Sequence, residues 1–351
     1  TADFENEMPR TERTELQYAK FISSLVHDKG LLHCDQKAVG RIIEYSSRQA
    51  EDQTKLSLHA ADIANLLRES NYWARQANAN MIRVGHVEKA LDSEEHRNSR
   101  IKDNVFETIK NRTTLMDTSG SVVGQINALS VLSTGGYEFG MPNRITATCR
   151  YGDGDIIDIE RDAKLGGTIH SKGVMILSSY LASVFAKREP MHLSASITFE
   201  QSYGEVDGDS ASLAELCALI SSLSEVPIRQ DLAMTGSVNQ FGEVQPVGGL
   251  NEKIEGFFDT CEIRGFTGTQ GVILPSTNVH NLMLDKRVID GVNKGNFNVY
   301  AVKNVSEALF LLTGLRSGNA NAEGRYPKNS IYGKIQALLD ELREEDDDED
   351  E

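Results

Sequence analysis

The sequence has few cysteines and no long apolar run, and these two absences define its setting. The four cysteines of the 351-residue chain are scattered, and no two form a Cys-x-x-Cys pair. This pattern predicts buried free thiols in a reducing compartment rather than a disulfide or metal framework. The most apolar stretch, Gly173–Ala186, is interrupted by three serines and falls short of the roughly 18 residues of a membrane span. The first ten residues also lack a signal-peptide pattern, so we expect a cytoplasmic protein without a membrane partner.

Positive charge is scarce as well. The chain has 36 Lys and Arg residues against 52 Asp and Glu residues, a net charge of −16. Residues 340–351 hold ten carboxylates and one arginine, so this tail carries −9 and the other 339 residues carry −7. Because binding to nucleic-acid phosphate depends on Lys and Arg, this balance disfavours nucleic acid as a partner. The acidic tail has almost no apolar area to bury and is expected to be disordered.

Residues 1–110 are rich in helix formers and predict a small all-α bundle. Asp35 precedes one apolar stripe and is placed to cap its helix, and Gly30 follows another in the position that favours glycine. Four helices with short connections make a compact bundle. They are expected at residues 14–29, 35–47, 59–78 and 84–91, the last with a polar extension through Arg100.

Residues 111–315 differ in pattern, because strands punctuated by glycine alternate with helices. This predicts an α/β (α+β) domain. Its clearest strand is Leu193–Phe199, where apolar and hydroxyl side chains alternate, and helices are expected at 211–223 and 250–261. Residues 316–351 are predicted to form a polar linker, a short amphipathic helix over 331–343 and the disordered acidic tail.

One segment that could carry chemistry lies between a strand and a helix. Ser210 follows an acidic loop and opens an apolar helix, Gly208 permits a sharp turn, and Asp209 can cap the helix. A serine beside the free N–H groups of a helix start is well placed for an oxyanion-stabilising site. The alternative interpretation is a simple Asp/Ser helix cap.

A second segment contains a lysine at a core position. Leu250, Lys253, Ile254 and Phe257 follow helical spacing, so Lys253 falls on the buried stripe. Desolvation lowers the pKa of a lysine and produces a neutral amine that can act as a general base. The alternative is a lysine whose stem packs while its ammonium reaches water. Together the two segments suggest a Ser–Lys dyad.

Other chemistries have weaker support in the sequence. A Ser–His–Asp triad would need one of the nearby histidines, His170 or His192, and neither lies in a triad motif. There is no His-Glu-x-x-His motif or paired Cys/His spacing for a metal, and no phosphate-binding loop. We therefore expect no metal and no nucleotide site within this chain.

Residues 111–315 resemble the proteolytic domain of the Lon family of ATP-dependent proteases, and in particular its B-type and related branches. Four segments in the same order carry the resemblance: Gly167–Leu177, Gly204–Ser212 with its Gly-Asp-Ser-Ala-Ser core, Met234-Thr235-Gly236, and Val247–Lys253. The resemblance implies that Ser210 is the nucleophile and Lys253 its general base. It also implies that the Thr235 hydroxyl helps to hold the lysine, and that Asp209 controls access to the serine. A carboxylate beside Lys253 would favour the charged amine, so we expect Asp209 to point away as a helix cap or to swing aside.

Residues 12–100 resemble the small helical lid of an AAA+ ATPase module. The nucleotide-binding core that should precede the lid is absent, so ATP and Mg²⁺ are expected only in an upstream part of a longer protein. The stretch Leu58–Asp62, where such lids carry a phosphate-sensing arginine, has none. The family also implies a homo-oligomeric ring, expected to be a hexamer, that encloses the active sites and admits unfolded protein substrates.

The prediction is a serine endopeptidase with a Ser–Lys dyad, ATP-dependent in the parent protein. Two alternatives from other classes stay open. One is a catalytically silent, ring-forming regulatory or binding module. Loss of substrate turnover in Ser210→Ala would exclude this alternative. The other is an ATPase-coupled remodeller of nucleic acid, which the presence of both Ser210 and Lys253 argues against.

Overall fold

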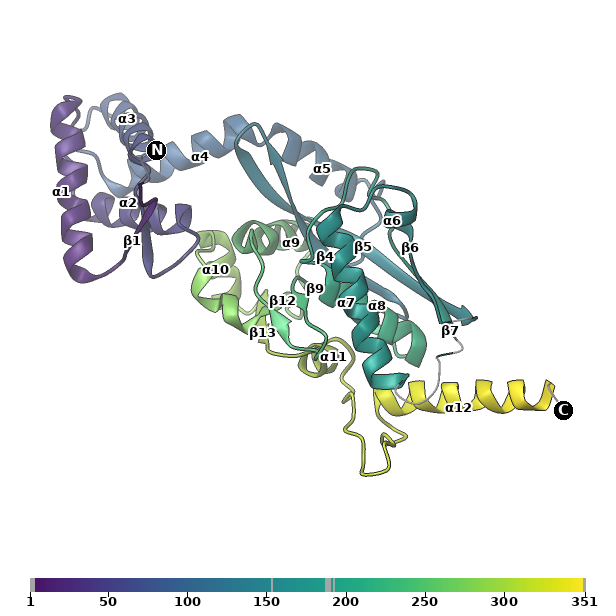
Figure 1. The fold of residues 1–351 in the computed structure, drawn as a ribbon. Coiled ribbons are helices and arrows are strands. Elements are labelled where there is room, and N and C mark those ends of the chain that lie inside the picture. Colours follow the sequence, from purple (N-terminus) through teal and green to yellow (C-terminus); the bar gives the residue numbers. More distant parts are fainter. Residues whose placement is uncertain (1–3, 153, 187–190, 192, 350–351) are drawn as a thin grey trace. The chain divides into compact units, whose positions relative to one another are not determined.

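The computed structural model describes residues 4–349 except 153, 187–190 and 192 (Figure 1). The chain forms two compact units, and two short segments from later in the sequence belong to the first unit. The first comprises residues 1–105 with 134–137 and 280–284, and the second comprises the rest. Each unit is built around its own cluster of buried apolar side chains.

The first unit is helical, as predicted. Its helices are α1 (Glu12–Asp28), α2 (Gln36–Gln49), α3 (Ala60–Gln76) and α4 (Val84–Asn98), and α5 (Arg100–Lys110) follows. The predicted cap is confirmed, because the Asp35 side chain accepts a hydrogen bond from Ala38 N at 2.8 Å. Gly30 has φ +63°, the left-handed conformation expected just after a helix end.

The predicted polar extension of the fourth helix is present, because α4 continues to Asn98. Two details differ from the sequence prediction, and the first is that a separate helix, α5, begins at Arg100. An antiparallel pair, β1 (Glu7–Pro9) with β2 (Lys55–Ser57), was not predicted, because three residues are too few to show alternation.

The second unit contains a seven-stranded mixed sheet in the order β13-β12-β9-β4-β5-β7-β6. Strand β12 is parallel to both β13 and β9, and β9 is parallel to β4, whereas β5 and β7 are antiparallel. The strands are β4 (Gln125–Thr134), β5 (Tyr137–Tyr151), β6 (Ile156–Asp158), β7 (Leu193–Phe199), β9 (Leu232–Met234), β12 (Gly271–Pro275) and β13 (Asn298–Val302). Short pairs outside this sheet are β3 (Ser121–Val122) with β8 (Ile228–Arg229), and β10 (Ser237–Val238) with β11 (Val244–Gln245).

Among the helices of the second unit, α8 (Ser212–Ser224) is the most buried. All but one of the residues of α8 are buried, and α7 (Thr168–Phe185) and α12 (Ile331–Glu349) pack against it (Figure 1). The remaining helical segments are α6 (Ile159–Asp162), α9 (Leu250–Arg264), the short 3₁₀ helix Ser276–Asn281, α10 (Lys286–Asn293) and α11 (Val305–Thr313).

The C-terminal segment is more ordered than the sequence suggested. The linker 316–330 lacks regular structure, but Ser317 and Ser330 are buried within it. Helix α12 then buries Ile331, Ile335 and Leu339 in the core of the unit. The prediction of a disordered tail over 340–351 is wrong up to Glu349, since a helix nucleated by packing propagates more easily than it starts.

All four cysteines are free thiols. Burial raises the pKa of all four thiols, Cys34, Cys149, Cys217 and Cys261. The pKa of Cys34 rises to about 11, with a further contribution from the charge of Asp35.

The raised pKa values predict slow alkylation of the native protein. At pH 8 a thiol of pKa about 11 is ionised to about 1 part in 10³, against roughly a quarter for an ordinary cysteine. We therefore expect iodoacetamide to label the native protein slowly and all four cysteines rapidly in denaturant, as counted by intact-mass spectrometry. Rapid native labelling at any one cysteine would contradict the burial seen here.

Candidate active site

The turn that carries Ser210 is joined to the segment after β9. The Ser210 carbonyl accepts hydrogen bonds from Gly236 N at 2.8 Å and from the Thr235 hydroxyl at 3.3 Å. In return, Leu213 N donates to the Gly236 carbonyl at 3.1 Å. Since Thr235 N donates to Ile273 O of β12, the start of α8 is tied through this segment to the middle of the sheet. The Ser210 side chain itself is half-buried.

Asp209 does not cap α8, contrary to the prediction. The helix begins at Ser212 with Ala211 as its N-cap residue, and no side chain caps it. The Asp209 carboxylate instead accepts a hydrogen bond from the Ser237 hydroxyl at 2.8 Å. The structure thus brings Asp209, Ser210 and Thr235 together on one backbone crossing. The predicted sharp turn is confirmed, because Gly208 has φ +97°.

The acidic loop before Ser210 is attached to the first turn of α7. Asp207 accepts a hydrogen bond from Ile169 N at 3.2 Å, and Val206 pairs with Gly166 as an isolated parallel bridge. Gly167 lies close to the Asp207 side chain, since a Cβ at Gly167 would overlap the Asp207 carboxylate unless that side chain moved. One turn further along α7, a Cβ at Gly173 would lie 3.3 Å from Asp209 Cβ, so α7 packs directly on the turn before the serine.

Lys253 lies on α9 and is buried as predicted, with only 4% of its surface exposed. Helix α9 starts after Gly249, whose φ of +63° is the left-handed conformation, and a Cβ there would lie 2.6 Å from the Val131 side chain. The middle of the helix crosses β5 at two glycines. A Cβ on Gly140 would overlap the carbonyl of Glu252, and a Cβ on Gly256 would overlap the carbonyl of Gly140. The backbone that carries Lys253 is therefore held directly against the sheet.

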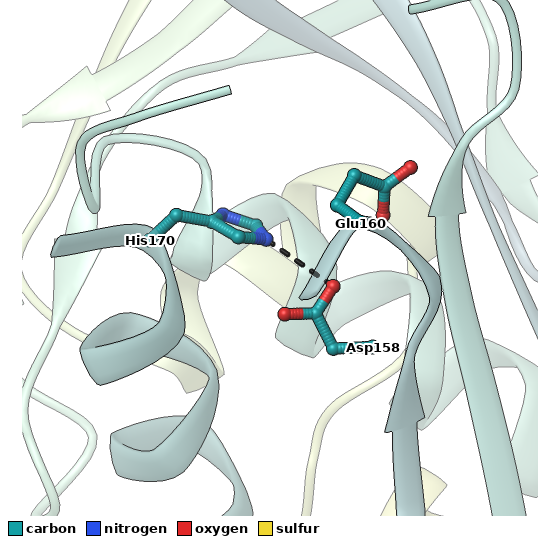
Figure 2. Close-up of side chains that lie close together, drawn as sticks. All are labelled: Asp158, Glu160 and His170. Carbon is teal, nitrogen blue, oxygen red and sulfur yellow. Dashed lines mark hydrogen bonds and ion pairs between the residues drawn. The ribbon is translucent and has the colours of Figure 1, made fainter. Parts of the chain in front are cut away.

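A second group of ionisable side chains is buried in the same unit and was not predicted from the sequence. Asp158 of β6, Glu160 of α6 and His170 of α7 converge, with one possible ligand atom of each within 4.8 Å of the others (Figure 2). His170 Nε2 lies 3.3 Å from Asp158 Oδ1 and 3.9 Å from Glu215 Oε1 on α8. These four residues are between 1% and 3% exposed. The other histidine considered for a triad, His192, lies outside the described residues.

The pKa values in this group reflect its burial. Burial raises the pKa of Glu215 to about 7, with the charge of His170 opposing the shift and those of Asp158 and Glu160 adding to it. Burial alone would lower the pKa of His170, but the hydrogen bond to Asp158 and the surrounding carboxylate charges raise it overall. Burial would raise the pKa of Asp158, but its hydrogen bond and ion pair with His170 lower it overall.

The mixed sheet and its flanking helices form an α/β domain of a known class. The family model for the Lon protease (S16) C-terminal proteolytic domain matches residues 118–313. The model for the archaeal LonB AAA+ ATPase LID domain matches residues 33–97. The chain belongs to the Lon protease family. This confirms both the family resemblance and the predicted fold, an α/β proteolytic domain preceded by a helical AAA+ lid.

Individual relatives agree with the family models. The chain is 51% identical to a putative Lon protease homolog of Escherichia coli (strain K12) over 64% of this chain and 39% of that protein. It is 36% identical to a putative Lon protease homolog of Haemophilus influenzae over 92% of this chain and 53% of that protein. It is 28% identical to an archaeal Lon protease of Archaeoglobus fulgidus over 86% and 46%, respectively. The chain thus spans about half or less of the length of these relatives. Among the described helices, none has the length and apolar character needed to cross a membrane.

Proposed function

We propose that this chain is the lid and catalytic part of a serine endopeptidase that uses Ser210 and Lys253 as a dyad. The observation that carries the proposal is the burial of Lys253 at 4% exposure in a domain of the Lon protease family. Lysine is rarely buried to this degree unless it is paired or functional. The hydrogen bonds that fix the Ser210 turn to Thr235 and Gly236 support a rigid nucleophile position.

In the proposed reaction, Lys253 as a neutral amine removes the proton of the Ser210 hydroxyl, and Ser210 Oγ attacks the peptide carbonyl. The protonated lysine then donates to the leaving amine, and water hydrolyses the acyl-enzyme. Backbone N–H groups near Ser210 would hold the oxyanion. Because Ser212 N already donates to the Asp209 carbonyl at 3.0 Å, the amides of Ser210 and Ala211 are the candidates. Thr235 and Asp209 are proposed as supporting residues, and the Asp209 carboxylate accepts a hydrogen bond from the Ser237 hydroxyl.

The proposal extends to the assembly and its energy source. The substrates are unfolded proteins, and the protein works as a homo-oligomeric ring, proposed to be a hexamer, formed by head-to-tail contacts that close on themselves. The lid match at residues 33–97 supports a link to an AAA+ core elsewhere in the parent protein, which would bind ATP and Mg²⁺. This chain is proposed to bind neither. The four free thiols support a reducing compartment such as the cytoplasm.

The test compares two substrates and two proteins. A short fluorogenic peptide and unfolded casein are incubated with this chain and with the longer parent protein, each with and without ATP. We expect peptide cleavage by both proteins, and casein cleavage that ATP accelerates only for the parent. No new peptide ends by mass spectrometry under any condition would instead favour the catalytically silent module. The molar mass by light scattering tests the ring separately.

A further inference from the structure

The cluster of Asp158, Glu160, His170 and Glu215 gathers three carboxyl groups around one imidazole. All four residues are at most 3% exposed, and burial favours the protonated, neutral form of Glu215. Among the described residues, the only ionic side chain in direct contact with the carboxylates of Asp158 and Glu215 is His170. Buried charge without compensation is strongly unfavourable, so such a cluster holds either bound protons or a bound cation.

Three oxygen atoms in this cluster have no hydrogen-bond partner among the described residues. They are Asp158 Oδ2, Glu160 Oε2 and Glu215 Oε1. Glu160 is the clearest case, because its other oxygen, Oε1, accepts from Phe199 N and from the Thr198 hydroxyl, both at 2.9 Å. Strand β7 therefore orients this carboxylate and leaves its other oxygen without a hydrogen-bond partner among the described residues. Outer partners commonly fix a metal ligand in this way.

The spacing of these atoms suits a metal ion. Two ligands that are each about 2.0 Å from a tetrahedral ion are about 3.3 Å apart, and His170 Nε2 and Asp158 Oδ1 are 3.3 Å apart. The same nitrogen lies 3.9 Å from Glu215 Oε1, and the atoms of Asp158, Glu160 and His170 lie within 4.8 Å of one another. Glu215 lies outside this group of three, so its carboxylate would have to move inward to complete a four-ligand site.

We propose that Asp158, Glu160 and His170, with Glu215 as the fourth ligand, bind a divalent first-row transition-metal ion of the Zn²⁺ or Mn²⁺ type. One imidazole with carboxylates and no thiolate selects this class over Cu(I), and the imidazole argues against Mg²⁺ and Ca²⁺. The ion would replace bound protons as the counter-charge to the carboxylates. All four ligands are buried, so the site has no room for substrate and its role is structural.

The proposed ion would connect the elements that position the serine turn. His170 lies next to Ile169, whose amide donates to Asp207 of the acidic loop. Glu215 is one helical turn after Ser212, at the start of α8. Asp158 and Glu160 come from the sheet edge. Metal binding would thus hold α7, α8 and β6 together near the serine turn. The proposed metal site does not depend on the proposed proteolytic mechanism.

The first experiment uses the whole chain, purified without a histidine tag. The protein is unfolded in EDTA and refolded with EDTA, with Zn²⁺ or with Mn²⁺. We expect one equivalent of bound metal after desalting, and a rise in Tm of about 5–10 °C at a metal concentration about a hundredfold above the Kd. Equal Tm values in all three conditions and no bound metal would show that the cluster is an ion-pair network without a metal, and would overturn the proposal.

The second experiment places the metal. Glu160→Gln keeps the oxygen that accepts from Phe199 and Thr198 but replaces the other oxygen with an amide nitrogen. We expect the affinity for the metal to fall at least about tenfold, since even the loss of an outer partner of a ligand has an effect of that size. His96→Ala removes an exposed histidine of the helical unit and should bind as wild type does. Unchanged stoichiometry and affinity in Glu160→Gln would show that the ion binds elsewhere and would also overturn the proposal. Should Glu160→Gln fail to fold, the refolding comparison on the unaltered chain still decides the matter.

Discussion

Replacing Ser210 with alanine is expected to lower kcat for peptide cleavage by at least about 10³-fold while leaving the fold intact. The change removes only a half-buried hydroxyl. The hydrogen bonds that hold the turn use the Ser210 carbonyl, which alanine retains. A fluorogenic peptide assay measures kcat, and the thermal melt checks the fold. Ser202→Ala, in the loop that leads to the same turn, is the matched control and should keep wild-type activity.

Lys253→Ala is the companion test, and its expected loss is about 10²–10⁴-fold, the range of a general base. If the two residues act as a unit, the double variant should be no slower than the slower single variant. Lys172→Ala, an exposed lysine on α7, controls for the loss of a positive charge. Cleavage by Lys253→Ala at the wild-type rate would show that another group accepts the serine proton, and the dyad would have to be abandoned.

The second large effect is expected at the crossing of β5 and α9. An alanine at Gly140 or Gly256 would place a methyl group in the space of a backbone carbonyl of the opposite element. Because the overlapping atoms are backbone atoms and not the end of a flexible side chain, they cannot easily move aside. We expect a loss of about 3 kcal/mol or more in the free energy of unfolding, which corresponds to a fall in Tm of roughly 6–12 °C. Because α9 carries Lys253, any protein that still folds should also lose activity.

Gly248→Ala provides the control for this crossing. It lies in the loop just before α9, and a Cβ there would have no atom within 4 Å. Its effect on the free energy of unfolding should stay within about 0.5 kcal/mol. Differential scanning calorimetry on the three variants measures the contrast. Equal Tm values for Gly140→Ala and Gly248→Ala would mean that the strand and the helix are not in the close contact described.

The sequence was most informative where a local pattern and a local structure coincide. The helices that carry Lys253 and follow Ser210 begin within one residue of their predicted starts, because apolar spacing and glycine mark them. Strand β5 gives a weaker local signal, since Gly140 and Pro142 interrupt the strand pattern of its first half. Gly140 is required there by a helix more than a hundred residues later, and that requirement is invisible locally.

The same limit explains the two errors at the site. Asp209 has the right residue type and position for a cap, but Ser237, 28 residues away, offers a donor that only the folded chain brings near. The cluster around His170 draws Asp158, Glu160 and Glu215 from separate elements and follows no short motif. The only signal in the sequence is the presence of a histidine and carboxylates at positions that are otherwise apolar. The spacing of these residues along the chain does not show that their side chains meet in the fold.

The packing of α12 bears on how this protein can be divided into working pieces. The family model for the proteolytic domain ends at residue 313, yet the core of that domain also contains Ile331, Tyr332, Ile335 and Leu339. The Tyr332 hydroxyl forms a 2.7 Å hydrogen bond with that of Tyr180 on α7. An expression fragment cut at the family boundary would therefore expose an apolar groove on α7 and α8 to solvent. The smallest soluble catalytic fragment should instead retain the loop after α11 and at least the first three turns of α12.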